Sequence, residues 1–286
     1  MASLPPESRL RRVSGGACAS GVRGSPVKPP IHTHTPSAFW STLRRIEKPS
    51  LFLDVGSMNG DVAFRAETEL PASLCFAIEA NPANAQGIRN EAARRRSRIR
   101  VEEVAAFDAN GDGTFYVETP KRGTNIGTSS VFGVEAAHAR PTPVRLRRLD
   151  SYPEIASANT LALWVDVEGA AFEVLSGLGE ALGRVVLADV EVERDALRQG
   201  QSRTASDVER IMAAHGLHPI ADDFRAASQP IGDVVYLRKD LLDDRAIARS
   251  LPRVRFWAIR HAQRLAFRLL PMSAYIFVRA VVLRRL

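Results

Sequence analysis

Short apolar runs alternate with amphipathic stretches along the central part of the chain, and this pattern predicts alternating strands and helices. The predicted strands are 51–55, 74–79, 99–105, 114–117, 161–165, 185–192, 217–221 and 233–238. The predicted helices are 61–69, 82–94, 170–178 and 204–215. Such alternation favours an α/β fold with a doubly wound, mostly parallel sheet and helices on both faces. Ligands of such sheets bind outside the carboxyl ends of the strands.

The regularity is lost at both ends, which divides the chain into three parts. Residues 1–36 are rich in Pro, Gly, Ser and Thr and lack apolar periodicity, so we expect a disordered leader. One catalytic domain is expected over 37–242. Residues 243–286 carry Arg at a four-residue spacing between apolar side chains, which predicts a basic amphipathic helical tail that Pro252 and Pro271 divide into pieces.

The first strand runs into a glycine-containing turn, Leu51-Phe-Leu-Asp-Val-Gly-Ser-Met-Asn-Gly60. Gly56 can take backbone angles closed to other residues, and Gly60 lets the next helix begin close to a ligand. The second strand ends in Glu79, nineteen residues beyond Gly60. A carboxylate there would accept hydrogen bonds from ribose hydroxyls, so this half of the chain predicts a nucleoside-containing cofactor.

The turn narrows the choice of cofactor. A phosphate-binding loop would end in Gly-Lys-Ser/Thr, which is absent. A dinucleotide loop prefers a middle glycine where Met58 stands, and this side chain would crowd a pyrophosphate. S-adenosylmethionine has no phosphates and fits better. The alternative is an ordinary strand-to-helix turn without a ligand.

Asp166 and Glu168 follow the strand 161–165, and they are the candidate catalytic residues. Methyl transfer to a hydroxyl needs a positioned base, and either carboxylate could take the proton while the other contacts the cofactor's ammonium group or the acceptor. Asp166 could instead cap the helix that begins near Gly169. A magnesium site of Asp166, Glu191 and Glu193 is conceivable but not favoured.

The segment Leu163-Trp-Val-Asp-Val-Glu-Gly-Ala-Ala-Phe-Glu-Val-Leu-Ser-Gly177 resembles the signature of the FkbM family of methyltransferases. Other motifs occur in family order: Asp54 to Gly60, Glu79-Ala-Asn-Pro82, Ala105-Ala-Phe-Asp108 and Arg148-Leu-Asp150. The resemblance covers about residues 50–240. It implies a Rossmann-like class I methyltransferase that uses S-adenosylmethionine to methylate a hydroxyl on a sugar, glycolipid or secondary metabolite. The cofactor-binding residues that we expect are Asp54, Gly56, Ser57, Gly60, Glu79, Ala80, Asn81 and Ala105.

The chain departs from the family pattern at Trp164, where Lys is common, and at Ala171, where an acid is common. These departures leave open a second reading, a catalytically silent cofactor-binding scaffold at a membrane surface. A nicotinamide-dependent oxidoreductase is a third reading, which Met58 disfavours. The loop Lys121–Ser130 is rich in Gly, Ser and Thr, and we interpret it either as a substrate-facing loop or as a plain surface loop.

The charge is unevenly distributed along the chain. The total is +7, but residues 1–50 carry +6, residues 51–242 carry −7 and residues 243–286 carry +8. An acidic core is unlike a nucleic-acid methyltransferase, so no nucleic-acid partner is expected. The basic tail fits an anionic membrane surface, and it equally fits a helix packed on the core or on a second subunit of an oligomer.

The remaining features concern the compartment. Cys18 and Cys75 cannot build a disulfide framework, which fits a reducing cytoplasm. The N-terminal basic residues are not followed by an apolar stretch, so no secretory signal is expected. The longest late apolar run is broken by Arg279 and is too short to span a bilayer. We therefore expect a cytoplasmic protein, with the tail as a means of peripheral attachment to the inner face of the membrane.

Overall fold

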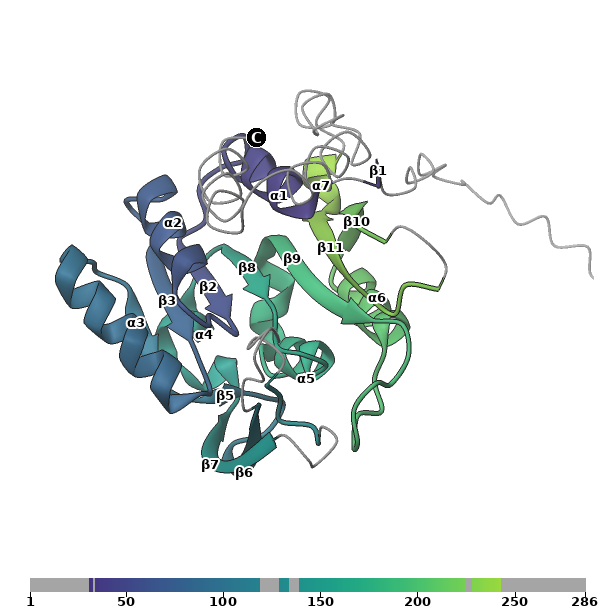
Figure 1. The fold of residues 1–286 in the computed structure, drawn as a ribbon. Helices are drawn as coiled ribbons and strands as arrows, with labels where there is room; N and C mark the ends of the chain where they lie inside the picture. The colour runs from purple at the N-terminus through teal and green to yellow at the C-terminus, as the bar shows by residue number, and fades with distance from the viewer. Residues whose placement is uncertain (1–30, 33, 119–128, 134–138, 225–227, 243–286) are drawn as a thin grey trace, which may run out of the picture.

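The computed structural model describes residues 31–32, 34–118, 129–133, 139–224 and 228–242. Within them, the main sheet has the strand order β1-β10-β11-β9-β8-β2-β3-β4 (Figure 1). The bounds are β1 (Ile31–His32), β2 (Leu51–Val55), β3 (Leu74–Ile78), β4 (Arg100–Glu102), β8 (Leu161–Val165), β9 (Val185–Glu193), β10 (Leu217–Asp222) and β11 (Ile231–Arg238).

The centre of this sheet is parallel, and one side of it is antiparallel. β4, β3, β2, β8 and β9 pair in parallel, whereas β11 runs antiparallel to both β9 and β10. Because β3, β2 and β8 are neighbours in register, their carboxyl ends lie side by side. The three segments that follow these strands therefore meet at one edge of the sheet.

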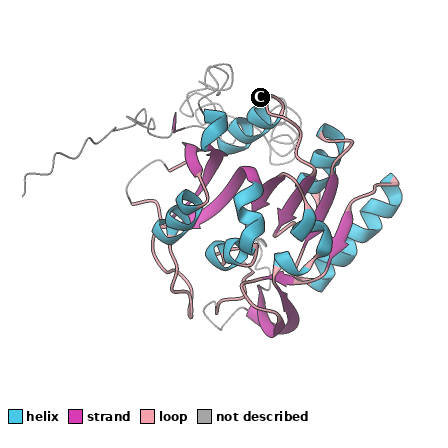
Figure 2. Ribbon diagram, turned by 180° about the vertical axis from the view of Figure 1, so that it is seen from behind, coloured by secondary structure: helices cyan, strands magenta, loops and turns pink. Residues whose placement is uncertain are grey.

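Helices cover both faces of the main sheet (Figure 2). One face packs against α1 (Thr35–Leu43), α2 (Asp61–Glu69) and α3 (Pro82–Arg95). The other packs against α4 (Pro153–Ser157), α5 (Ala171–Ser176) and α6 (Ala205–Ala214). The short helices η1 (Leu149–Ser151) and η2 (Gly179–Arg184) join the second layer, and α7 (Lys239–Leu242) follows β11. The predicted doubly wound, mostly parallel α/β fold is confirmed.

The strand predicted at 99–105 is divided between two sheets. β4 ends at Glu102, and β5 (Ala105–Ala106) belongs to a small sheet with β6 (Gly111–Glu118) and β7 (Ala139–Arg147) in the order β5-β7-β6. β7 was not predicted, because its prolines argue against a strand. Pro141 and Pro143 are tolerated because β5 pairs only with the last two residues of β7, which leaves them bonded to β6 alone.

The prediction of a disordered leader over residues 1–36 is wrong for the last residues of that range. Ile31 and His32 pair with Ala221 and Asp222 of β10, and α1 begins at Thr35. Residues 1–30 and the predicted tail over 243–286 lie outside the described residues, so the tail stays a prediction. Among the helices that the structure describes, none is long and apolar enough to cross a membrane.

The two departures from the family pattern are packing residues in this fold. Trp164 lies on the face of β8 covered by α1, where its ring centroid is 5.3 Å from that of Phe39 and 6.2 Å from that of Trp40. Ala171 is the first residue of α5 and is buried in the core of the opposite layer. Neither side chain lines the cavity at the carboxyl ends of the strands.

Candidate functional site

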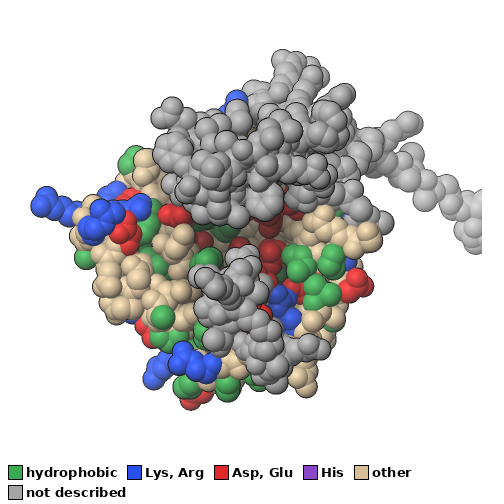
Figure 3. Space-filling model, in the orientation of Figure 1, with side chains coloured by type: hydrophobic (Ala, Val, Ile, Leu, Met, Phe, Trp, Pro, Cys, Tyr) green, Lys and Arg blue, Asp and Glu red, His purple; other side chains and the backbone are tan. Residues whose placement is uncertain are grey.

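A cavity of about 240 Å³ opens at the carboxyl ends of β3, β2 and β8. Figure 3 shows acidic side chains gathered in the hollow of this face. The residues that line the cavity come from β2, β3 and β9, from the segments that follow β2, β3, β4 and β8, from β5, β6 and α3, and from the segment 129–131. They are Val55, Gly56, Met58, Ile78, Glu79, Ala80, Asn84, Val104, Ala105, Ala106, Phe115, Ser129, Val131, Asp166, Val167, Glu168, Ala170 and Glu191.

The turn after β2 forms the floor of the cavity, and a buried carboxylate supports it. Gly56 has a φ of +82° and Gly60 a φ of +78°, both in the left-handed region. Asp54, 1% exposed, accepts hydrogen bonds from the Ser57 hydroxyl (2.5 Å) and from the backbone N–H of Ala63 in the first turn of α2 (3.0 Å). Burial raises the pKa of Asp54 to about 7. Asp54 therefore shapes the turn from below, and it does not line the cavity.

Glu79 closes β3 beside this turn. Its two carboxylate oxygens accept hydrogen bonds from the backbone N–H groups of Met58 and Asn81, each at 2.7 Å. Burial raises the pKa of this carboxyl, and these two hydrogen bonds act in the opposite direction. Each oxygen keeps acceptor capacity, so the side chain can still receive hydroxyl groups from a ligand.

Small and apolar side chains form the wall next to Glu79. Ile78, Val104, Ala105, Ala106 and Phe115 line this part of the cavity. The alanines leave room that larger side chains would fill, and the surface they present is suited to a flat aromatic ring. This wall and the Glu79 carboxylate together suit a nucleoside. The residues present therefore fit the cofactor that the sequence predicts.

The opposite wall is formed by carboxylates at the ends of β8 and β9. Asp166 and Glu168 follow β8, and Glu191 lies near the end of β9, which pairs with β8. The protein that surrounds the Asp166 carboxyl raises its pKa to about 6, although the side chain is exposed in the cavity, and the Arg198 guanidinium lowers the pKa. Burial, followed by the nearby charges of Asp166 and Glu168, raises the pKa of Glu191 to about 9. Burial also raises the pKa of Glu168 to about 7, and the Arg198 guanidinium lowers it.

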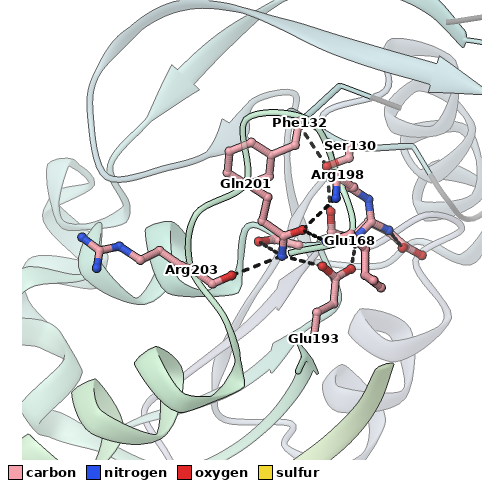
Figure 4. A network of polar contacts seen from close by, with 9 residues as sticks. Ser130, Phe132, Glu168, Glu193, Arg198, Gln201 and Arg203 are labelled. Atoms are coloured by element: carbon pink, nitrogen blue, oxygen red, sulfur yellow. Dashed lines mark hydrogen bonds and ion pairs between the residues drawn. The ribbon is translucent and has the colours of Figure 1, made fainter. Parts of the chain in front are cut away.

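Arg198 connects the ends of these two strands (Figure 4). Its guanidinium forms ion pairs with Glu168 and with Glu193, and its side chain is only 8% exposed. The Gln201 side chain donates to Glu193 at 2.5 Å. The Ser130 hydroxyl donates to the backbone carbonyl of Glu168 at 2.7 Å. The segment that carries Ser130 and the loop that carries Arg198 thus both contact Glu168.

A metal ion would have to use a different set of carboxylates from the one that the sequence indicated. Asp166, Glu168 and Glu191 each offer one oxygen within 4.8 Å of the other two. Glu193 belongs instead to the ion pair with Arg198. Because the same guanidinium binds Glu168, a divalent cation would compete with it for this carboxylate.

The structure brings together only part of the predicted site. Both candidate catalytic residues, Asp166 and Glu168, line the cavity, and the expected cofactor residues Gly56, Glu79, Ala80 and Ala105 line it too. The other four do not line the cavity: Asp54 lies in β2, and Ser57, Gly60 and Asn81 lie in the turns that follow β2 and β3. Asn81 instead caps α3 by accepting a hydrogen bond from Ala83 N. The α5 helix has Ala170 at its N-cap and no side-chain cap, so the capping role considered for Asp166 is wrong.

Several residues of the site escaped the sequence reasoning. Arg198 and Gln201 lie in a loop without periodicity, and nothing local distinguishes Arg198 from the many other arginines. Asn84 and Phe115 line the cavity from α3 and β6. The candidate substrate loop 121–130 lies outside the described residues except for its last two, of which Ser129 lines the cavity and Ser130 binds Glu168.

The fold and the site can be compared with known proteins. A family model described as the methyltransferase FkbM domain matches residues 54–218. The 2-O-methyltransferase NoeI of Sinorhizobium fredii (strain NBRC 101917 / NGR234) is 28% identical over an aligned length of 173 residues, and the match covers 54% of this chain and 69% of the relative.

Solved structures with a similar fold include two methyltransferases. Magnesium protoporphyrin IX methyltransferase from Synechocystis PCC 6803, with bound SAH, has a TM-score of 0.40 and 9% identity over 71% of this chain and 80% of its own. Precorrin-6y C5,15-methyltransferase from Geobacter metallireducens GS-15 has a TM-score of 0.37 and 13% identity over 71% and 86%.

Proposed function

Because this chain belongs to the FkbM family of methyltransferases, we propose that it transfers a methyl group from S-adenosylmethionine to a hydroxyl oxygen. The proposed acceptor is a sugar, a glycolipid or a secondary metabolite. The similarity to a protein named as a 2-O-methyltransferase supports oxygen as the acceptor atom.

One observation carries the proposal, namely the arrangement of carboxylates around the turn after β2. The strand order β3-β2-β8 places Gly56 between Glu79 on one side and Asp166 on the other. Glu79 and its apolar wall would hold the ribose and the adenine ring. Asp166 and Glu168 then lie toward the end of the cofactor that reacts. This supports one cavity that binds both the nucleoside and the acceptor.

The chemistry at the β8 end follows from these residues. Bound S-adenosylmethionine supplies an electrophilic methyl group attached to a positively charged sulfur. A carboxylate at the end of β8 would accept the acceptor's hydroxyl proton while the oxygen–carbon bond forms and the carbon–sulfur bond breaks. The proton ends on the carboxylate, and the bonding pair of the broken bond stays with sulfur. The protein's other contribution is to hold the reacting groups in line.

The first prediction concerns Glu79. The Glu79→Gln variant replaces one acceptor oxygen with a donor that faces the N–H of Met58 or Asn81, and it removes a partner for the ribose. We expect it to weaken binding of S-adenosylmethionine and of S-adenosylhomocysteine at least tenfold, which is about 1.4 kcal/mol. Isothermal titration calorimetry measures both affinities, with NAD as a comparison ligand.

A matched variant separates this effect from a general loss of charge. Glu103→Gln changes a side chain that is 39% exposed and pairs with Arg89 away from the cavity, so its affinity should equal that of the wild type. Thermal unfolding should show that both variants are folded. If neither sulfur nucleoside binds, or if NAD binds more tightly, the proposed function is wrong.

The second prediction distinguishes an enzyme from a silent binding protein. With tritium in the methyl group of S-adenosylmethionine, the protein should transfer label to a carbohydrate or lipid fraction of a cell extract. A labelled methyl group on a hydroxyl oxygen forms an ether, which should survive mild alkali. Mild alkali hydrolyses methyl esters and would release a label held as an ester. Cofactor binding without any transfer of label would favour the silent scaffold.

A further inference from the structure

The loop 194–201 joins β9 to the segment before α6, and it buries a positive charge beside the candidate catalytic carboxylates. The Arg198 side chain is 8% exposed, and its guanidinium pairs with Glu168 through one nitrogen and with Glu193 through the other. Glu193 is almost fully buried. A buried arginine that bridges two carboxylates fixes the positions of both, because breaking either contact leaves a charge without a partner.

Gln201 fixes the loop that carries Arg198. Its side-chain oxygen accepts hydrogen bonds from the backbone N–H groups of Leu197 (2.9 Å) and Arg198 (3.1 Å), and its amide nitrogen donates to Glu193 at 2.5 Å. The loop therefore cannot move Arg198 without also losing contacts to the end of β9.

Glu168 is held at its backbone as well as at its side chain. Its φ of +51° lies in the left-handed region, which is unusual for a residue other than glycine and needs support from its surroundings. Ser130 supplies part of that support by donating to the Glu168 carbonyl. The segment that carries Ser130 is tied to the Arg198 loop, since Gly133 and Gln199 exchange backbone hydrogen bonds of 2.9 and 2.8 Å.

The Asp166 side chain, unlike that of Glu168, is not held in place by contacts with other described residues. It lines the cavity and is exposed there, and no described residue donates a hydrogen bond to its carboxylate or pairs with it. Glu191 also lines the cavity, but it is less exposed than Asp166, and one of its carboxylate oxygens is buried. The charged groups that act on Glu168 besides Arg198 are Asp166 and Glu118.

We propose that Arg198 is a positioning residue that immobilises Glu168 at the wall of the cavity, and that Asp166 is therefore the group that takes the proton from the acceptor hydroxyl. This assignment rests on the proposed function. The proton moves from the acceptor oxygen to a carboxylate oxygen of Asp166 as the methyl group moves to the acceptor oxygen. Glu168 stays paired with Arg198 throughout that step.

The contact between Arg198 and Glu168 can be tested without an acceptor. In protein labelled with 13C at the glutamate carboxyl carbons and saturated with S-adenosylhomocysteine, the Glu168 signal is the one missing from the Glu168→Gln variant. Loss of the guanidinium in Arg198→Met should raise the titration midpoint of Glu168 by at least one pH unit, and Arg198→Lys should raise it less. The control Arg210→Met removes an exposed arginine of α6 and should leave the midpoint unchanged.

An unchanged Glu168 midpoint in Arg198→Met would overturn the positioning role. If Arg198→Met does not fold, the double variant Arg198→Met/Glu193→Gln removes the buried charge left on Glu193 and permits the same measurement. A midpoint that stays at the wild-type value in the double variant would overturn the proposal equally.

The label-transfer assay identifies the base. Its acceptor probe is a fraction of the cell extract that receives the labelled methyl group. Asp166→Asn should lower the transfer rate about 100-fold. Glu168→Gln should lower it about tenfold and preserve the fall in rate at acid pH. The reverse pattern would make Glu168 the base and overturn the proposal. If no fraction takes label, the proposed function and the assignment of Asp166 both fail, whereas the carboxyl titration still decides the role of Arg198.

Discussion

At the scale of single residues, Gly56 is the position where two segments of backbone touch. A Cβ atom added there would lie 1.7 Å from the carbonyl oxygen of Asp166, and the φ of +82° is itself unfavourable for other residues. We predict that Gly56→Ala destabilises the protein by about 3 kcal/mol or more, because the strand ends must separate. Urea unfolding measures this loss, and calorimetry should show loss of cofactor binding.

Gly87 provides the matched control for that substitution. It lies inside α3, and a Cβ atom built on it would have nothing within 4 Å. Gly87→Ala should therefore stabilise the protein by about 0.5–1 kcal/mol, because alanine is the better helix former. Equal stability of the two variants would show that the close approach of Gly56 to Asp166 does not exist in solution.

At the scale of elements, α1 is an integral part of the domain. Phe39 is 0% exposed, and its ring contacts those of Trp40, Phe52 and Trp164. We predict that Phe39→Ala costs about 3–5 kcal/mol of unfolding free energy, because it leaves a cavity between the helix and the sheet. Arg45→Ala, in the exposed turn that follows the same helix, should cost less than about 1 kcal/mol by the same urea measurement. A small effect of Phe39→Ala would mean that α1 is not docked.

At the scale of the whole molecule, the buried carboxyls determine how stability depends on pH. Burial raises the pKa of Asp54 and of Asp233 to about 7 and that of Glu191 to about 9. The folded state keeps these protons at pH values where the unfolded chain has released them. The free energy of unfolding should therefore fall as the pH rises from about 5, up to about pH 7 for Asp54 and Asp233 and up to about pH 9 for Glu191.

Urea unfolding of the ligand-free protein across this range tests the sign of the slope. Glu191→Gln should flatten the part between about pH 7 and 9, because the variant has no proton to release there. Glu91→Gln should leave the slope unchanged above pH 5, because Arg94 and Arg95 lower the pKa of that exposed carboxyl to about 2. A stability that rises between pH 5 and 9 would show that these carboxyls are ionised in the folded state.

The elements that the sequence predicted best are those with local signals at both ends. β2 and β8 have the predicted bounds, because Gly56 and Asp166 end their apolar runs, and α2 has them because it begins directly after Gly60. The prediction over 99–105 joined β4 to β5, since alternation of apolar side chains does not reveal that the chain passes from one sheet to another. The prolines of β7 concealed a strand whose partner lies on one side only.

The site residues likewise divide into those with a local sequence signal and those without one. Gly56, Glu79, Asp166 and Glu168 could be predicted because each occupies the end of a recognisable strand, and parallel strands place such ends at one edge. Ser130, Arg198 and Gln201 come from loops far apart in sequence, and their convergence on Glu168 and Glu193 has no local signal.

The sequence by itself determined the kind of sheet and the edge at which a ligand binds, because periodicity and turn residues act over a few positions. Only the tertiary structure decided which carboxylate is tied to Arg198, which faces the cavity without a partner, and which carboxyls have a pKa raised by burial. Those properties depend on distances and on the exclusion of water between distant segments, and only the packing of the folded chain fixes them.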